Sequence, residues 1–346
     1  MSTNVTFVAI DTGTTKTKLW LAEGSAVRQR TQLAVGVRNS AISGNRKQLS
    51  QSLRQALAPF VNHAAGRPEF ILAAGMITSG LGLLEIPHVV APAGKEELSK
   101  HVRMKRFPAI CPLPFFFVPG VRIGSGPYSV DDLGQADLIR GEETEIVGLM
   151  TDGRWRGPLL YFHLGSHTKA IMVDRYGCIV RSTTTLGGES LQALRSQTIL
   201  ASQLANVGDV ALDHGFFRRG MECTQRRGLL RALFSIRLLG ENRRYTPAQL
   251  YSFLLGAILT SEVRAFRRQG LLGTKRLRVV LSGHPLLQRA WKLMLELHGR
   301  RTQFLTPAQT EKAFLRGLRE VVFSSQVFQL FSHSVRASRG AAKASS

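Results

Sequence analysis

A segment near the start of the chain is repeated near its middle. Residues 162–173 (FHLGSHTKAIMV) align with residues 10–21 (IDTGTTKTKLWL), which places Gly165 on Gly13. Each segment predicts two strands joined by a glycine-containing turn and then, after a second such turn, a third strand. Because the strands, the turns and their order repeat together, the pattern indicates two copies of one structural unit.

The segments that follow each repeat predict an α/β fold. After the first repeat we expect a helix containing Leu53 and Leu57, a buried strand over residues 70–74 and a helix after residues 140–144. After the second repeat we expect helices over residues 188–206, 210–219 and 224–238, a long helix that begins at Thr246-Pro247, a strand over residues 277–281, a helix to His298, a short strand to Leu305 and a helix opened by Thr306-Pro307.

This order of elements predicts two domains, over residues 1–150 and 158–330, with a linker at residues 151–158. The final residues, 332–346, are small, polar and basic. We predict that they form a flexible tail that frays.

The composition is that of a globular protein, with 44% hydrophobic and 20% charged residues among 346. Its three cysteines, Cys111, Cys178 and Cys223, form no CxxC pair, which argues against a disulfide framework or a zinc site. The first ten residues lack the features of a signal peptide, and no apolar segment reaches the roughly 20 residues of a membrane span. We therefore expect a cytoplasmic protein with no membrane partner.

The formal net charge of +23 would attract nucleic acid, anionic membranes or acidic metabolites. The basic residues are dispersed and are mostly arginines, for example Arg226-Arg227 and Arg267-Arg268, and several fall where helices should end. No basic motif interleaved with aromatic residues accompanies them. We favour a solvated, arginine-rich surface over a nucleic-acid footprint. Nucleic-acid binding stays an open alternative.

The turn at residues 11–16 (DTGTTK) has the chemistry of a phosphate loop. Its glycine permits unusual backbone angles, and its consecutive amide and hydroxyl donors can converge on phosphate oxygens. Asp11 is placed to hold a magnesium-bound water. The echo at residues 164–169 (LGSHTK) suggests a second loop, so that two loops could clamp one triphosphate. The chain has no P-loop, no GxGxxG between a strand and a helix, and no GxSxG at residues 160–167.

From about residue 5 to residue 325, the chain resembles the 2-dehydro-3-deoxygalactonokinase family of the actin, hexokinase and Hsp70 superfamily. The matching landmarks are residues 11–15 (DTGTT), Gly75-Met76 with Ser79, residues 140–144 (RGEET), residues 165–169 (GSHTK), residues 187–189 (GGE) and Ser282-Gly283. The RGEET string is the most specific of these. The chain departs from the residues usual in the family at Lys16, Leu83, Leu164 and Ala170.

The resemblance implies duplicated ribonuclease-H-like domains of the actin-like ATPase type, with ATP in an interdomain cleft. It implies that the loops at Asp11 and Gly165 hold the phosphates and that Gly283 lies near the adenosine. It also implies that the acceptor is a 2-keto-3-deoxy sugar acid, most simply 2-dehydro-3-deoxy-D-galactonate, phosphorylated at its terminal hydroxyl.

Phosphoryl transfer needs a metal ion, positioned donors and a carboxylate near the attacking hydroxyl. We assign Asp11 to Mg²⁺, through water, and Glu142 or Glu143 to the role of base. The cofactor-binding residues are then Gly13, Thr14, Thr15, Lys16, Gly165, Ser166, His167, Lys169 and Gly283. On the acceptor side we place Gly75, Met76 and Ser79, together with Arg140, which could hold the substrate carboxylate in a bidentate contact.

Three questions stay open from the sequence. His167 could be a phosphate ligand, a structural group or a proton shuttle. The same fold could also serve a phosphatase or polyphosphate hydrolase, or a non-catalytic, basic nucleic-acid-binding homologue. A homodimer is possible.

Overall fold

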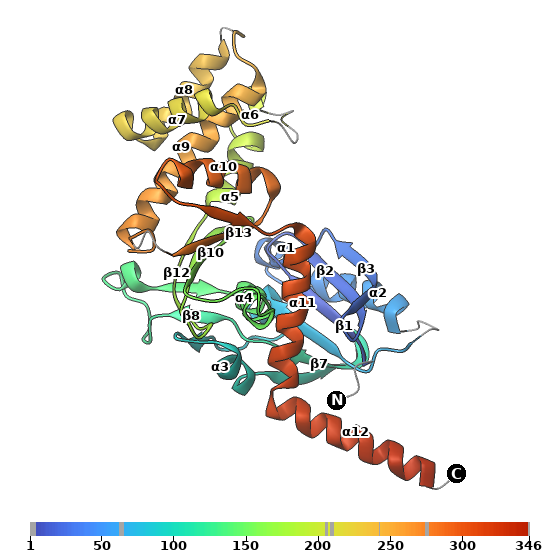
Figure 1. Cartoon of the computed structure of the whole chain (residues 1–346). Helices are drawn as coiled ribbons and strands as arrows, with labels where there is room; N and C mark the ends of the chain where they lie inside the picture. Colours follow the sequence, from blue (N-terminus) through green and yellow to red (C-terminus); the bar gives the residue numbers. More distant parts are fainter. Residues whose placement is uncertain are drawn as a thin grey trace.

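The computed structural model describes residues 5–61, 66–204, 207, 211–241, 243–273 and 277–344; for residue 336 and residues 338–344 it describes the backbone only. The described residues form two main sheets and a small one (Figure 1). The first sheet has the order β3-β2-β1-β4-β7-β6, with β1 Thr6–Thr12, β2 Thr17–Glu23, β3 Ala26–Leu33, β4 Ile71–Gly75, β6 Arg103–Phe107 and β7 Cys111–Phe117. The small sheet consists of β5 Val89–Val90, β8 Val121–Ile123 and β9 Asp137–Ile139.

The second main sheet repeats the topology of the first. Its order is β12-β11-β10-β13-β14, with β10 Leu159–Leu164, β11 Thr168–Val173, β12 Ile179–Thr185, β13 Arg278–Gly283 and β14 Thr302–Phe304. In both sheets an antiparallel meander is followed by a strand that pairs in parallel with the first strand of the meander. The duplication predicted from the sequence is confirmed at the level of topology.

Helices cover the sheets and fill the space between them. In the first half these are α1 Val37–Ser43, α2 Lys47–Val61, α3 Lys95–Lys100 and α4 Glu142–Thr151, with 3-10 turns η1 Met76–Thr78 and η2 Leu133–Gln135. In the second half they are α5 Gly187–Ser196, α6 Ala201–Leu204, α7 His214–Arg227, α8 Leu229–Glu241, α9 Pro247–Arg268, α10 Pro285–Glu296, α11 Pro307–Phe323 and α12 Gln326–Ala344. None of the helices in the described ranges combines the length and apolar character needed to cross a membrane.

Helices α4 and α11 lie side by side between the two sheets (Figure 1). Their backbones approach so closely that a Cβ at Gly148 would lie 1.7 Å from the carbonyl oxygen of Ala313, and a Cβ at Gly317 would lie 1.9 Å from that of Thr144. The apolar cluster around them takes residues from both sheets, including Phe7 and Tyr161. The two halves therefore share one core at this helix pair.

Helix α11 lies within the range predicted for the second domain, yet it also packs on the first sheet. Its Phe314 ring lies 5.6 Å from that of Trp20, and Phe323 makes an edge contact with Phe7. The next helix, α12, covers most of the segment that we predicted to fray, and its Phe328 is buried against Phe323. The aromatic contacts that hold this helix come from residues before position 332. The composition of the tail alone could not indicate them.

The helices between residues 188 and 241 differ from the prediction. The predicted helix over residues 188–206 ends at Ser196, with the short α6 after it; residues 205 and 206 lie outside the described residues. Asp213 caps α7, accepting a hydrogen bond from the Phe216 amide at 2.9 Å, and the helix runs on to Arg227. The predicted break at residues 220–223 was wrong because the chain turns instead at Gly228, whose φ of 81° favours glycine. Residue 210, where the predicted helix begins, lies outside the described residues.

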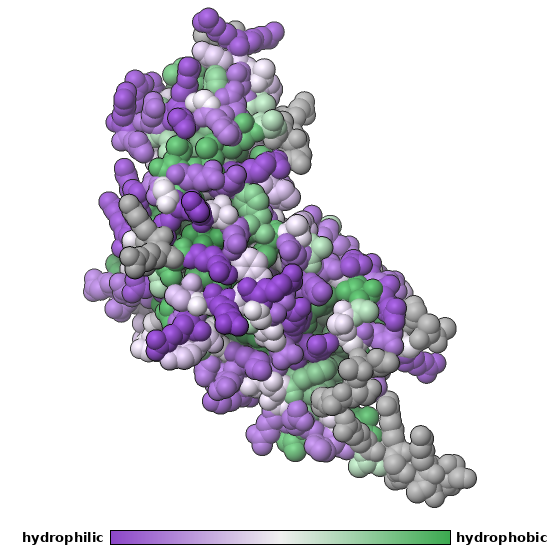
Figure 2. Space-filling model, viewed as in Figure 1, coloured by the Kyte–Doolittle hydropathy of each residue, from purple (hydrophilic) through white to green (hydrophobic). Residues whose placement is uncertain are grey.

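Helices α6, α7 and α8, with the outer part of α9, form a lobe that projects from the second sheet (Figure 1). The predicted cap of α9 is confirmed: Thr246 accepts from the Gln249 amide, and Pro247 is the first helical residue. Arg226-Arg227 and Arg267-Arg268 occupy the last turns of α7 and α9 and are exposed. The visible face of the molecule is mostly hydrophilic (Figure 2). Arg300 differs from these exposed arginines, because it is buried and donates to the Leu272 carbonyl at 2.6 Å.

Candidate active site

The two sheets place equivalent residues at the ends of equivalent strands. In the first sheet, Asp11 and Thr12 end β1, and Thr12 pairs with Gly75 at the end of β4. In the second sheet, His163 and Leu164 end β10, and Leu164 pairs with Gly283 at the end of β13. Asp11 and His163 therefore hold the same position in the duplicated units.

The loops between the hairpin strands differ in length by one residue. The first spans residues 13–16 and the second spans residues 165–167, because Asp11 pairs with Lys18 while His163 pairs with Lys169. The ungapped alignment is therefore wrong beyond the loop, and Lys169 is the counterpart of Lys18.

Gly75 and Gly283 let the two strand ends approach each hairpin. Both have positive φ, 83° and 104°, which is the region that favours glycine. A Cβ at Gly75 would lie 2.6 Å from the Thr12 carbonyl oxygen, and one at Gly283 would lie 2.2 Å from that of Leu164. The predicted landmarks Gly75 and Gly283 are thus required by the backbone at equivalent places.

Both hairpin loops leave amide groups available to a ligand. Gly13 and Gly165 donate to carbonyls of their own loops, at Lys16 and His167. Within the described residues, no backbone carbonyl accepts from the remaining loop amides, which belong to Thr14, Thr15, Lys16, Ser166 and His167. Successive amides of this kind form anion-binding concavities. The structure brings these predicted cofactor-binding residues to the same edge of their respective sheets.

Asp11 lies at this edge in a mainly buried, partly charged environment. Its carboxylate is 4.0 Å from the Lys18 ammonium, and Oδ1 would be 3.0 Å from a Cβ at Gly75. Burial raises the pKa of Asp11 to about 6, and the charges of Glu145 and Glu142 add to this effect while Lys18 opposes it.

Glu142 and Lys169 form an ion pair between the two halves of the chain. The Lys169 ammonium donates to Glu142 Oε1 at 2.5 Å, and both side chains are largely buried. Burial tends to raise the pKa of Glu142, but Lys169 and His163 outweigh burial and lower it. Glu142 Oε2 is buried without a hydrogen-bond partner among the described residues. The predicted base and the predicted phosphate contact therefore touch each other, and one carboxylate oxygen is left over.

Glu143 has a different environment. It is fully buried, and both of its carboxylate oxygens accept from the Gly141 amide, at 2.9 and 2.8 Å. Burial, together with the charge of Glu142, raises the pKa of Glu143 to about 8. Its contacts are with the first turn of α4, whose exposed amides favour an acceptor.

The acceptor-side predictions are satisfied largely by protein contacts. Arg140 donates through Nη1 to Thr78 Oγ1 at 2.7 Å and through Nη2 to the Ile86 carbonyl at 2.8 Å, with His88 Nδ1 3.3 Å away. The predicted bidentate contact with a substrate carboxylate would have to displace an Nη2 hydrogen bond. Ser79, which is buried, donates to the Met76 carbonyl and closes the turn there; Met76 itself is half-buried.

Two more groups at the strand ends escaped sequence analysis. Glu145 on α4 accepts at one oxygen from Tyr161 Oη at 2.5 Å and from His163 Nδ1 at 3.0 Å. Burial tends to lower the pKa of His163, but Glu145 and Glu142 outweigh it and raise it. The repeat alignment could have indicated His163, because it places that residue on Asp11. A histidine aligned with an aspartate did not suggest a shared role, since the two side chains differ in charge.

His167 lies in the second loop with Nε2 3.8 Å from Glu189 Oε1 at the start of α5. Burial and the charge of Lys169 lower its pKa, so the neutral form is favoured. The contact is compatible with each of the roles left open for His167.

The residues at the strand ends fit a hydrated magnesium ion. No group of three or more His, Cys, Asp or Glu side chains in the described ranges is arranged to hold a metal. Magnesium in phosphate-transfer sites needs only one or two carboxylates, since water and substrate phosphates complete its shell. The Asp11 carboxylate, at the strand end beside the first loop, is a suitable ligand of this kind.

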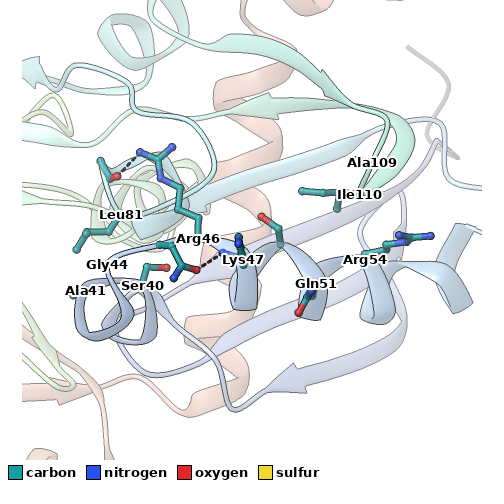
Figure 3. A pocket seen from close by; sticks show the side chains of 13 residues that line it. Ser40, Ala41, Gly44, Arg46, Lys47, Gln51, Arg54, Leu81, Ala109 and Ile110 are labelled. Atoms are coloured by element: carbon teal, nitrogen blue, oxygen red, sulfur yellow. Dashed lines mark hydrogen bonds between the residues drawn. The ribbon is translucent and has the colours of Figure 1, made fainter.

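A separate groove of about 760 Å³ lies beside α1 and α2 (Figure 3). Three cationic side chains, Arg46, Lys47 and Arg54, line it, and Arg46 donates to the Gly80 carbonyl at 2.5 Å. None of the predicted site residues lines this groove. The predicted carboxylates and the free loop amides lie instead at the strand ends.

Comparison with known proteins decides the family. The family model of 2-keto-3-deoxy-galactonokinase matches residues 11–321, from the first strand end to the last turns of α11. The chain belongs to this family. Members of the 2-keto-3-deoxy-galactonokinase family are kinases with an alcohol group as acceptor, so the chain is a sugar-acid kinase by family. No curated protein sequence matches the chain.

The chain is similar to several solved structures, and the first of those below shows the same fold. A Sinorhizobium meliloti protein proposed to be a 2-dehydro-3-deoxygalactonokinase has a TM-score of 0.68 at 21% identity, over 91% of this chain and 97% of that one. A proposed N-acetylglucosamine kinase from Porphyromonas gingivalis gives 0.47 at 15% identity, over 90% and 98% of the two chains. Component A of (R)-2-hydroxyglutaryl-CoA dehydratase from Acidaminococcus fermentans gives 0.45 at 12% identity, over 91% and 96%. The likeness to the Sinorhizobium meliloti structure, together with the duplicated sheets, confirms the predicted fold.

Proposed function

We propose that the kinase transfers the γ-phosphoryl group of ATP to the terminal hydroxyl of a 2-keto-3-deoxy sugar acid, with 2-dehydro-3-deoxy-D-galactonate as the acceptor and its 6-phosphate as the product. The family match over residues 11–321 carries this proposal. Three features support it: the amide-rich loops, Asp11 and the Glu142–Lys169 pair. These groups are of the kind that phosphoryl transfer needs.

In the proposed mechanism the loop amides hold the phosphate oxygens of ATP. Lys169 contacts the same oxygens while it keeps its bond to Glu142, since an ammonium has three donors. Magnesium, when bound, would neutralise charge on the β- and γ-phosphates. Asp11 would hold its water shell.

Glu142 is the better of the two candidate bases. Its free Oε2 can accept the proton of the sugar hydroxyl, whereas both oxygens of Glu143 are engaged by the Gly141 amide. A depressed pKa makes Glu142 a weak base. In a loose phosphoryl-transfer transition state the hydroxyl needs orientation more than early deprotonation, so a weak base suffices.

Two measurements test the function. Millimolar Mg-ATP should raise the melting temperature of the nucleotide-free protein, because a ligand bound only by the folded state stabilises it. ATP consumption should then depend on an added 2-keto-3-deoxy sugar acid. ATP consumption at the same rate without any sugar would instead indicate a hydrolase, and salt-dependent binding of DNA or RNA with no Mg-ATP shift would indicate a nucleic-acid-binding protein.

A further inference from the structure

His163 has the position of Asp11 in the second sheet, but it carries the opposite charge when protonated. It precedes the second loop, as Asp11 precedes the first. The two residues are also close enough for the charge of His163 to act on Asp11.

The hydrogen bonds of His163 fix which way its ring points. Nδ1 lies 3.0 Å from Glu145 Oε2, and a carboxylate only accepts, so Nδ1 carries the proton that joins them. Tyr161 donates to the same oxygen at 2.5 Å and holds the carboxylate in place. With Nδ1 engaged, only Nε2 is available to a ligand.

Nε2 faces the second loop. A Cβ at Gly165 would lie 3.2 Å from this nitrogen, and the described residues offer Nε2 no hydrogen bond. About a quarter of the side chain is exposed, so a ligand in the loop can reach it. The loop itself offers the amides of Ser166 and His167, so Nε2 extends the set of donors by one.

The charges around the ring favour its protonated form. Glu145 and Glu142 reach it from α4 and Asp11 from β1, while Lys169 from β11 and His167 from the loop oppose them. The acidic groups prevail. An arriving phosphate would strengthen this preference further.

We infer that His163, oriented by Glu145 and Tyr161, binds the phosphate oxygens of the nucleotide by donating a hydrogen bond from Nε2. The inference rests on the proposed function and adds a cationic contact to the second loop. Glu145 is a positioning residue, because it acts through the imidazole.

The test compares nucleotide affinity across pH in three variants. His163→Gln should weaken Mg-ATP and Mg-ADP binding about ten- to hundredfold, the size of one hydrogen bond to a charged group, and should leave adenosine binding unchanged. In the wild type, Mg-ATP affinity should fall as the pH rises above the pKa of His163. In His163→Gln that part of the pH dependence should vanish, and any titration of the nucleotide itself is common to both proteins.

Glu145→Gln keeps an acceptor for Nδ1 and for Tyr161 but removes the charge. It should move the midpoint of the pH dependence to lower pH, which a purely structural contact between α4 and β10 would not do. His101→Gln is the control, because His101 is exposed at the end of α3. Unchanged Mg-ATP affinity and pH dependence in folded His163→Gln would overturn the inference and leave the kinase proposal intact. If the wild type itself binds no Mg-ATP, the proposed function fails first.

Discussion

Lys169 donates to Glu142 Oε1 at 2.5 Å and thereby joins β11 of the second half to the first residue of α4 in the first half. Both side chains are at most 12% exposed. A buried pair of this kind ties the geometry of the site to the stability of the fold, because neither charge can be removed alone without leaving the other unpaired.

Removal of one partner should therefore be costly. Lys169→Met leaves a buried, unpaired carboxylate, and we expect it to lower the free energy of unfolding by about 3–5 kcal/mol. The double variant Glu142→Gln/Lys169→Met should recover much of this loss but no turnover. Denaturant unfolding of the two single variants and the double variant measures the coupling. Additive effects would show that the pair contributes nothing as a pair.

Glu142 and Glu143 should respond differently to the same substitution. Glu142→Gln should reduce turnover by about a hundredfold to ten-thousandfold, as expected when a positioned acid–base group is lost. Glu143→Gln should keep near-normal turnover, because the Glu143 carboxyl contacts the Gly141 amide at the N-cap of α4 and its raised pKa favours the protonated form near neutral pH. Steady-state kinetics on both variants decides. Full turnover in both would place the base elsewhere, with Glu189 next to be tested.

The elevated pKa of Glu143 also predicts a pH dependence of stability. The folded-state pKa of about 8 lies above the ordinary value of 4.5, so the folded protein holds the proton more tightly. The contribution of Glu143 is fully present below pH 4.5 and is lost as the pH rises towards 8. The melting temperature of Glu143→Gln relative to wild type should therefore increase over that window. A constant difference across the window would contradict the assigned burial effect.

Asp11→Asn should separate activity from stability. Turnover should fall by orders of magnitude, because the charge that organises the metal is lost. Stability should not fall with it: ionised Asp11 destabilises the fold above its folded-state pKa of about 6, and asparagine removes that cost. We expect an equal or higher melting temperature at pH 7. Unchanged turnover would remove Asp11 from the mechanism.

The contact of α4 with α11 should not tolerate a side chain. Gly148→Ala and Gly317→Ala would each drive a Cβ into a carbonyl oxygen of the facing helix, at a cost of about 1–3 kcal/mol or more. Gly126→Ala is the control, since no atom lies within 4 Å of the added Cβ. Thermal unfolding compares the three. Equal melting temperatures would show that the helices separate without cost.

Local signals in the sequence predicted much of the fold. The repeated turns at Gly13 and Gly165 and the Thr-Pro caps of α9 and α11 depend on neighbouring residues, and all are found. The turn at Gly228 was missed because an isolated glycine inside a helical pattern has several meanings. The contact of Gly148 with α11 was out of reach, since it joins residues more than 160 positions apart.

The sequence likewise predicts one part of the candidate site and not the other. The loops and Asp11 carry a local pattern that predicts phosphate binding. The pairing of Glu142 with Lys169, and of Glu145 with His163, depends on how α4 meets the second sheet. The spacing of residues in the sequence does not predict how this helix packs against that sheet. The different environments of the adjacent Glu142 and Glu143 likewise depend on the orientation of one helix turn.

The bare backbone contact between α4 and α11 has a consequence for the placement of the site. At Gly148 and Gly317 no side chain separates the two helices, so their backbones fix each other's position. Glu142 lies at the start of α4, less than two helical turns from Gly148, and its place therefore depends on this contact as well. Lys169 of β11 is bound to Glu142, so the second hairpin is tied to the same helix start.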